Sequence, residues 1–146
     1  MLVVDANIVL AAALGTRSGR SLEWVGQHRE LTISEDAAVE ILSVAEALVR
    51  RGRDARALAA SYLATLSIRP RDSYTAHVSL AAQTLRHAVA SRNGSVADAH
   101  LLALAWRLEA DIWSHDRDFA GTGWPSWSSA NLVEALDAAP ALDPEA

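Results

Sequence analysis

The chain has 146 residues, of which 51% are hydrophobic and 21% charged, a composition that suits one folded domain and is too apolar for a disordered chain. It contains no cysteine, and all 13 of its basic residues are arginine. Disulfides, thiolate metal sites and cysteine nucleophiles are therefore excluded, as are lysine bases, Schiff-base lysines and the lysine of a phosphate-binding P-loop. The formal net charge of −5 argues against a surface that coats nucleic acid broadly.

The first 14 residues have the apolar composition of a signal peptide. No basic residue precedes them, and Asp5 and Asn7 interrupt the apolar run, so we predict a buried strand at residues 2–4 followed by a helix from about residue 7. No other run approaches the roughly 18 apolar residues that a membrane span needs. We expect no membrane association and a cytoplasmic location.

Runs typical of β-strands recur along the chain, each followed by a stretch with helical spacing. The predicted strands lie at residues 2–4, 31–34, 66–69 and 112–114. Further helices are predicted over residues 38–50, 54–65, 73–91 and 96–109.

This alternation predicts parallel strands joined by helical crossovers. The expected fold class is α/β, with three α/β/α layers around an open parallel sheet of four to five strands. A single domain is expected over residues 1–138, and residues 139–146, which contain two prolines, are expected to form a flexible tail.

Three aspartates are predicted to converge at one edge of this sheet. Asp5 directly follows the first strand and Asp116 follows the last, so both lie at the carboxyl ends of parallel strands, where open α/β sheets bind ligands. Asp98 lies in the first turn of the helix before the last strand and points toward the apolar face of that helix. A carboxylate in that direction needs a partner.

Each acid also has a purely structural explanation. Asp5 can cap the helix that follows it, and Asp98 can form a capping box with Ser95. Asp116 and Asp118 can belong to a solvated turn. Convergence favours a site, because independent caps and turns have no reason to gather at one end of one sheet.

A cluster of carboxylates needs positive charge nearby. Two carboxylates about 5 Å apart repel by about 3 kcal/mol at an effective dielectric constant near 20. No arginine adjoins Asp5 or Asp98 in the sequence, so a divalent cation is the predicted partner, and oxygen ligands select Mg²⁺ or Mn²⁺. The five histidines form no zinc-type pair. Only His115 is expected near the cluster, either as a ligand or as a solvated turn residue.

The helix after the second strand offers a fourth acid. Glu40 and Glu46 lie at opposite margins of its apolar face, and the spacing does not choose between them. Both can also be ordinary surface glutamates.

The motifs resemble the PIN domain nucleases, and among them the small VapC-like toxins. The family's first strand and its metal-binding aspartate are similar to VVDANIVL, and its most recognisable signature is similar to VADAHLLALAWRLEADIWSHDRDF. The strand and helix with the family's second acid are similar to ISEDAAVEILSVAEAL, whose apolar positions favour Glu40 over Glu46. The resemblance implies that the protein binds one or two Mg²⁺ or Mn²⁺ ions. The implied catalytic residues and metal ligands are Asp5, Glu40, Asp98 and Asp116, with Asp118 as a further candidate ligand.

The resemblance also implies roles for polar residues beside the acids. Asn7 and Ser114 would hydrogen-bond to the carboxylates or to metal-bound water. Arginines suit bidentate phosphate contacts, and the candidates are Arg17, Arg20 and Arg117. For any one of these arginines, surface solubility is the alternative role.

The implied activity is metal-dependent hydrolysis of RNA phosphodiester bonds by the toxin of a type II toxin–antitoxin pair, a homodimer bound by a cognate antitoxin. The alternatives are a PIN-like module that binds RNA or protein without cleavage, and a PIN nuclease outside a toxin–antitoxin system. Haloacid-dehalogenase-like phosphatases and response-regulator receivers are disfavoured, because both families use a lysine that this chain lacks.

Overall fold

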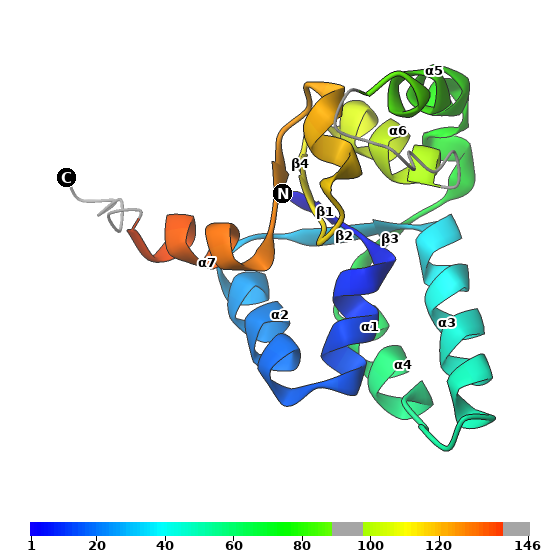
Figure 1. Cartoon of the computed structure of the whole chain (residues 1–146), viewed down its shortest axis with the longest axis vertical. Helices are drawn as coiled ribbons and strands as arrows, with labels where there is room; N and C mark the ends of the chain where they lie inside the picture. The colour runs from blue at the N-terminus through cyan, green and yellow to red at the C-terminus, as the bar shows by residue number, and fades with distance from the viewer. Residues whose placement is uncertain (89–97, 139–146) are drawn as a thin grey trace.

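A parallel sheet of five strands forms the middle of the molecule, in the order β3-β2-β1-β4-β5. The computed structural model describes residues 1–88 and 98–138, with Arg117, Asp118 and Ala138 described by their backbone alone. The strands are β1 (Leu2–Val4), β2 (Leu31–Ser34), β3 (Ser67–Arg69), β4 (Asp111–Trp113) and β5 (Ser126–Trp127). The predicted fold class, a three-layer α/β/α domain with an open parallel sheet, is confirmed (Figure 1).

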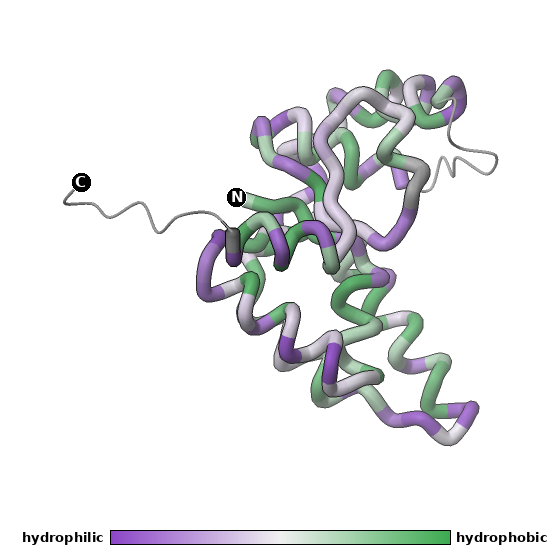
Figure 2. Tube along the Cα trace, turned by 60° about the vertical axis from the view of Figure 1, so that its left-hand side comes forward, coloured by the Kyte–Doolittle hydropathy of each residue, from purple (hydrophilic) through white to green (hydrophobic). Residues whose placement is uncertain are grey.

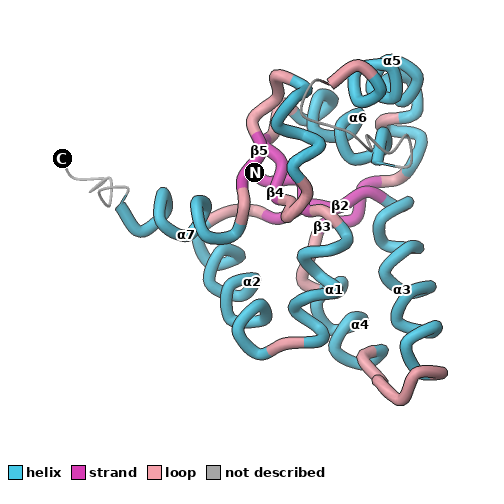
Figure 3. The backbone as a smooth tube through the Cα atoms, in the orientation of Figure 1, coloured by secondary structure: helices cyan, strands magenta, loops and turns pink. Residues whose placement is uncertain are grey.

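Helices cover both faces of the sheet (Figures 1 and 3). One face carries α1 (Ala6–Leu14), α2 (Thr16–His28), α3 (Glu35–Val49), α4 (Arg56–Ala64) and α7 (Ser129–Ala138). The other carries α5 (Thr75–Arg86), α6 (Ala99–Leu108) and the 3-10 helix η3 (Arg117–Thr122). A second 3-10 helix, η1 (Arg71–Ser73), connects β3 to α5.

The two-residue period of the strands divides the core between these faces. In β1, Leu2 and Val4 pack with the α1–α4 layer, whereas Val3 packs with α5 and α6. In β4, Trp113 belongs to the first layer and Ile112 to the second. Helices therefore cover both faces of the central strand β1, which explains why β1 is a continuous apolar run. At the edge of the sheet, Ile68 of β3 is exposed. Figure 2 shows the hydrophobic run of β1 and α1 leading away from the N-terminus.

The strand order reverses at β1. The chain runs outward from β1 through β2 to β3 and then returns, through α5 and α6, to place β4 on the other side of β1. Because parallel crossovers are right-handed, the reversal moves the connecting helices to the opposite face. The gap between the ends of β1 and β4 is therefore the switch point at which open α/β sheets bind ligands.

Several elements differ from the sequence-based expectations. The helix expected over residues 73–91 is shorter, because α5 ends at Arg86, just after the core residue Leu85. The start of the helix expected from residue 96 lies outside the described residues, and its described part is α6, which begins at Ala99. The sequence pattern did not predict α2, β5 or α7. In α2, Gly19 permits close packing, since a Cβ there would lie 2.5 Å from the hydroxyl of Tyr62 in α4.

Among the described residues, no helix is long and apolar enough to cross a membrane. The expected tail at residues 139–146 lies outside the described residues, and so does Ser95, the partner of Asp98 in the capping-box interpretation.

Candidate active site

Asp5 stands between the end of β1 and the start of α1. The residue is only 7% exposed. Its Oδ1 accepts a long hydrogen bond of 3.4 Å from the backbone N–H of Asn7, the capping contact of α1. Its Oδ2 accepts a much shorter bond of 2.6 Å from the Ser114 hydroxyl. Asp5 does cap its helix, but its stronger contact is to the neighbouring strand end.

Ser114, the residue after β4, joins the two sides of the switch point. Its hydroxyl oxygen accepts a 2.9 Å hydrogen bond from the backbone N–H of Asp116 while the hydroxyl donates to Asp5. The buried serine therefore has its donor and acceptor groups both engaged. This arrangement holds the Asp5 carboxylate in one orientation beside the chain segment that carries Asp116.

Negative charge accumulates around Asp5. Burial raises the pKa of Asp5 and the charge of Asp116 raises it further, against the hydrogen bonds from Ser114 and Asn7 and the charge of His100. Desolvation and the charge of Asp5 likewise raise the pKa of Glu40. No arginine of the described chain contributes to either shift, and the charge of His100 favours ionisation of Asp5.

The two candidate glutamates of α3 face different neighbours. Glu40 lies close enough to Asp5 for the two charges to interact, although the residue as a whole is exposed. Glu46 pairs with Arg56 at 3.7 Å, and its side chain is 66% exposed. The structure thus brings Glu40, and not Glu46, toward Asp5.

Asp98 is the N-cap residue of α6 and not, as the periodicity predicts, a residue of its first turn. His100, two residues later, has its Nδ1 2.8 Å from the Ser34 hydroxyl oxygen at the end of β2. Burial lowers the pKa of His100. Because His100 bonds to a strand end and acts on the charge of Asp5, the start of α6 lies at the same edge of the sheet as Asp5.

The expectation that His115 is the only histidine near the acids is therefore wrong. His100 is also there, and its one signal in the sequence is its position beside Asp98 at the start of a helix. His115 is exposed, and its Nε2 lies 2.9 Å from the Ser129 hydroxyl oxygen. The side chains of Arg117 and Asp118 lie outside the described part of the structure.

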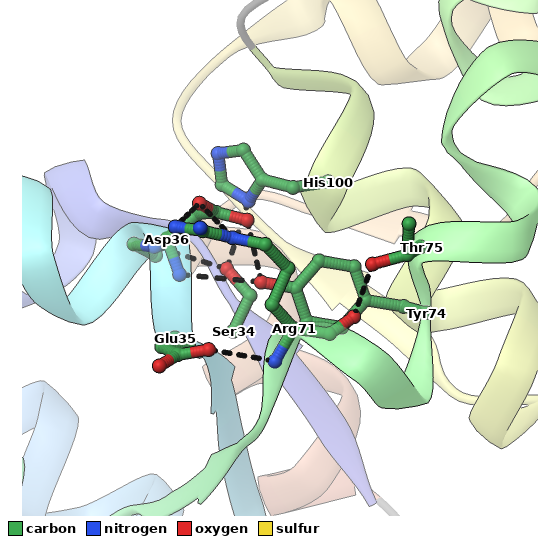
Figure 4. Close-up of polar contacts among 8 residues, drawn as sticks. Ser34, Glu35, Asp36, Arg71, Tyr74, Thr75 and His100 are labelled. Atoms are coloured by element: carbon green, nitrogen blue, oxygen red, sulfur yellow. Dashed lines mark hydrogen bonds and ion pairs between the residues drawn. The ribbon is translucent and has the colours of Figure 1, made fainter.

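A cluster of Asp36, Arg71 and Tyr74, which the sequence pattern does not predict, lies at the ends of β2 and β3 (Figure 4). The Tyr74 hydroxyl donates to Asp36 Oδ2 at 2.6 Å, and Arg71 Nη2 donates to Asp36 Oδ1 at 2.6 Å. Burial opposes ionisation of Asp36, but the hydrogen bonds from Tyr74 and Arg71 outweigh it and lower the pKa of Asp36. Burial and the bond to Asp36 raise the pKa of Tyr74 to about 12.

The family model of the PIN domain matches residues 3–137. The chain belongs to the PIN domain family. No protein of curated function matches it in sequence. The match covers all three predicted motif regions and extends across the residues between them.

Solved structures share this PIN fold. VapBC2 of Rickettsia felis, bound to a DNA fragment from its promoter, superposes with a TM-score of 0.67 and 14% identity, covering 87% of this chain and 97% of that one. PAE2754 of Pyrobaculum aerophilum superposes with a TM-score of 0.69 and 18% identity, covering 94% and 89%. FitAcB of Neisseria gonorrhoeae gives 0.62 and 19%, covering 89% and 99%. At these identities the likeness establishes a common fold.

The side chains at the switch point of this PIN domain fit a hard divalent cation by their chemistry. The acids offer oxygen ligands only. Asp5 is buried, and the negative charge of Asp116 acts on it. Asn7 Oδ1 is buried and has no hydrogen-bond partner among the described residues. Among the side chains that the structure describes, which do not include that of Asp118, no group of three histidine or acidic residues lies close enough together to hold an ion.

A larger cavity, of about 540 Å³, lies between α2 and α4. Its wall includes Leu31 and Ser67, the first residues of β2 and β3. It is therefore at the opposite edge of the sheet from Asp5. Because of this position, the cavity takes no part in the chemistry of the acids, although it is large.

Proposed function

We propose that this PIN domain is a Mg²⁺- or Mn²⁺-dependent endoribonuclease that hydrolyses RNA phosphodiester bonds. The observation that supports it is the buried carboxylate of Asp5 at the switch point. The negative charge of Asp116 raises the pKa of Asp5, and the charge of Asp5 in turn raises the pKa of Glu40. Such a cluster is unfavourable without a cation. Membership of a family of nucleases supplies the reaction class.

The ligands of one or two ions would be Asp5, Glu40, Asp98 and Asp116, with Asp118 as a further candidate. A divalent cation, when bound, lowers the pKa of a coordinated water and stabilises a leaving oxygen. The residues around it have positioning roles. Ser114 holds the Asp5 carboxylate and bonds to the backbone of Asp116. The contact of His100 with Ser34 positions the start of α6, where Asp98 is the N-cap residue. No lysine base or cysteine nucleophile is required, in keeping with the composition.

Cleavage assays on single-stranded and structured RNA test this proposal. We expect activity with Mg²⁺ or Mn²⁺ and none in EDTA. Asp98→Asn should lower the rate by about 100-fold or more, whereas Asp137→Asn, the same change on an exposed residue of α7, should not. Activity that persists in EDTA would contradict the metal mechanism. Full activity with reduced stability in Asp98→Asn would assign Asp98 to the helix start, and RNA binding without cleavage would favour a non-cleaving module.

We further propose that the protein is the toxin of a type II toxin–antitoxin pair, forms a homodimer and binds a cognate antitoxin. Support comes from the similar folds of VapBC2, which is described as bound to DNA from its promoter, and of FitAcB. Expression should arrest growth, and co-expression of the neighbouring open reading frame should relieve the arrest. Light scattering should give twice the mass of the chain. Absence of arrest under full expression of active protein would place the nuclease outside such a system.

A further inference from the structure

A second cavity, of about 320 Å³, opens between α1, α2 and α7. It adjoins the switch point, because Trp113 and His115, which flank Ser114, are part of its wall. The buried indole of Trp113 forms part of an apolar floor. A volume near 300 Å³ lies at the lower end of small-molecule sites, which suits a single nucleotide rather than a longer segment.

The wall of this cavity is basic and rich in hydroxyl groups. Arg17, Ser18, Ser21, His115 and Ser129 line it, and no acidic residue is among the described residues that do. Arg17 is exposed and forms no ion pair or side-chain hydrogen bond within the described chain, so its guanidinium is available to a ligand. A guanidinium binds phosphate with two parallel hydrogen bonds.

The base of the cavity is held in place by Ser129. Trp113 Nε1 donates to its hydroxyl oxygen at 3.0 Å, and His115 Nε2 lies 2.9 Å from the same atom. These contacts join the start of α7 to the last residue of β4 and to the segment that follows it. The cavity therefore has a fixed position relative to Ser114 and to the acid site beside it.

The structure also separates Arg17 from Arg20, two of the three arginines that the sequence treats alike. Arg17 borders the cavity next to β4. Arg20, one helical turn later, borders two other hollows. One lies with Leu14 and Tyr62 at the end of α1 that is remote from Asp5, and the other lies between α2 and α7. Of these two arginines, only Arg17 lines the hollow that also includes Trp113 and His115.

We propose that the cavity between α1, α2 and α7 is a subsite for one nucleotide of the RNA next to the cleaved phosphodiester, with Arg17 binding the phosphate of that nucleotide. This inference rests on the proposed ribonuclease function. The mixed lining matches the ligand, since the hydroxyl groups can bond to a ribose or a base edge and the apolar floor can contact a ring. The neighbouring carboxylates repel phosphate unless a cation is present, so a separate basic contact is needed to hold the strand.

The test measures binding of a fluorescein-labelled single-stranded oligoribonucleotide by anisotropy, in EDTA so that nothing is cleaved. Arg17→Gln should weaken binding about tenfold and reduce the slope of log K against log salt by about 0.7, the value for one lost phosphate contact on a single strand. Arg86→Gln is the matched control, because it removes the same charge from an exposed position on α5, in the opposite layer. It should change neither quantity. Arg17→Lys should restore most of the salt slope.

A steric variant tests the cavity itself. Ser18→Leu adds bulk to the wall without changing charge, and it should weaken binding while leaving the salt slope unchanged. Thermal unfolding should be the same for Arg17→Gln and the wild type, because Arg17 is exposed. Wild-type affinity and slope in Arg17→Gln would overturn the subsite even if the protein cleaves RNA. A second outcome separates the two proposals. If Arg17→Gln binds RNA more weakly but the wild type does not cleave RNA with Mn²⁺, the subsite is supported and the ribonuclease function is rejected.

Discussion

Glu40 and Glu46 lie on the same helix and are chemically identical, yet their surroundings differ. Burial and the negative charge of Asp5 both raise the pKa of Glu40. Glu46 is a surface residue paired with Arg56, a contact of the kind that contributes little to stability. The surroundings of the two side chains therefore distinguish Glu40 from Glu46 as a candidate ligand, whereas the helical spacing does not.

This difference predicts that the two glutamates contribute unequally to cation binding. Glu40→Gln should weaken Mn²⁺ binding roughly tenfold or more, because it removes one charged ligand, and Glu46→Gln should leave it unchanged. Isothermal titration of the two variants, which carry the same chemical change, measures the contrast. Equal affinities would remove Glu40 from the proposed ligand set.

At the level of secondary-structure elements, the cluster of Asp36, Arg71 and Tyr74 joins α3 by hydrogen bonds to the segment between β3 and α5. Arg71 also donates its backbone N–H to Glu35 Oε2 at 2.7 Å, so η1 is bonded to the first turn of α3 at several points. Tyr74 is fully buried, and its hydroxyl has Asp36 as its partner. Because α5 begins at Thr75, this contact sets where that helix starts on the far face of the sheet.

Tyr74→Phe should therefore destabilise the domain in a pH-dependent way. The lowered pKa of Asp36 means that its contribution is present above its ordinary value of 3.8 and is lost as pH falls through the folded-state value. We expect a loss of about 1–2 kcal/mol in the free energy of unfolding at pH 6.5, decreasing toward pH 3.5. The raised pKa values of Asp5 and Glu40 affect both proteins equally and cancel in this difference.

Urea unfolding at a series of pH values measures the effect. Tyr62→Phe is the control, because the Tyr62 hydroxyl has no carboxylate partner among the described residues, and its small effect should not vary with pH. A loss in Tyr74→Phe that stays constant between pH 6.5 and 3.5 would show that the bond to Asp36 is not its cause.

Across the domain as a unit, the acid site opposes stability at neutral pH. A carboxyl group whose folded-state pKa is raised favours folding in its protonated form, and that contribution is lost as pH rises through the folded value. Asp5 and Glu40 are both of this kind. With a net charge of −5 and no lysine, the domain is expected to gain stability when a cation binds these acids.

Divalent cations should accordingly raise the melting temperature of the protein. A free Mn²⁺ concentration 100-fold above its dissociation constant corresponds to about 2.7 kcal/mol of stabilisation. Asp5→Asn should unfold at a higher temperature than the wild type in EDTA, since asparagine caps a helix as well as aspartate and carries no charge. Mn²⁺ should not raise its melting temperature further. Differential scanning fluorimetry at ionic strength matched with NaCl checks this, and an equal rise in both proteins would contradict a site at Asp5.

The sequence alone was sufficient for the α/β class and for the placement of Asp5 and Asp116 at strand ends. Both follow from local order along the chain: apolar runs report strands, and parallel strands end at one edge of their sheet. The PIN family resemblance, which the match over residues 3–137 confirms, was also readable from contiguous motifs.

The three-dimensional structure was needed for the neighbours of these residues. The bond from Ser114 to Asp5 joins residues 109 positions apart, and that from Tyr74 to Asp36 joins residues 38 apart. Helical and strand periods report the direction of a side chain relative to its own element, but they carry no information about which other element it meets. For that reason the nearness of His100 to Asp5 and the cavity beside Arg17 emerged only from the packed fold. The family resemblance already favoured Glu40, and the fold added the electrostatic contact with Asp5 that distinguishes it from Glu46.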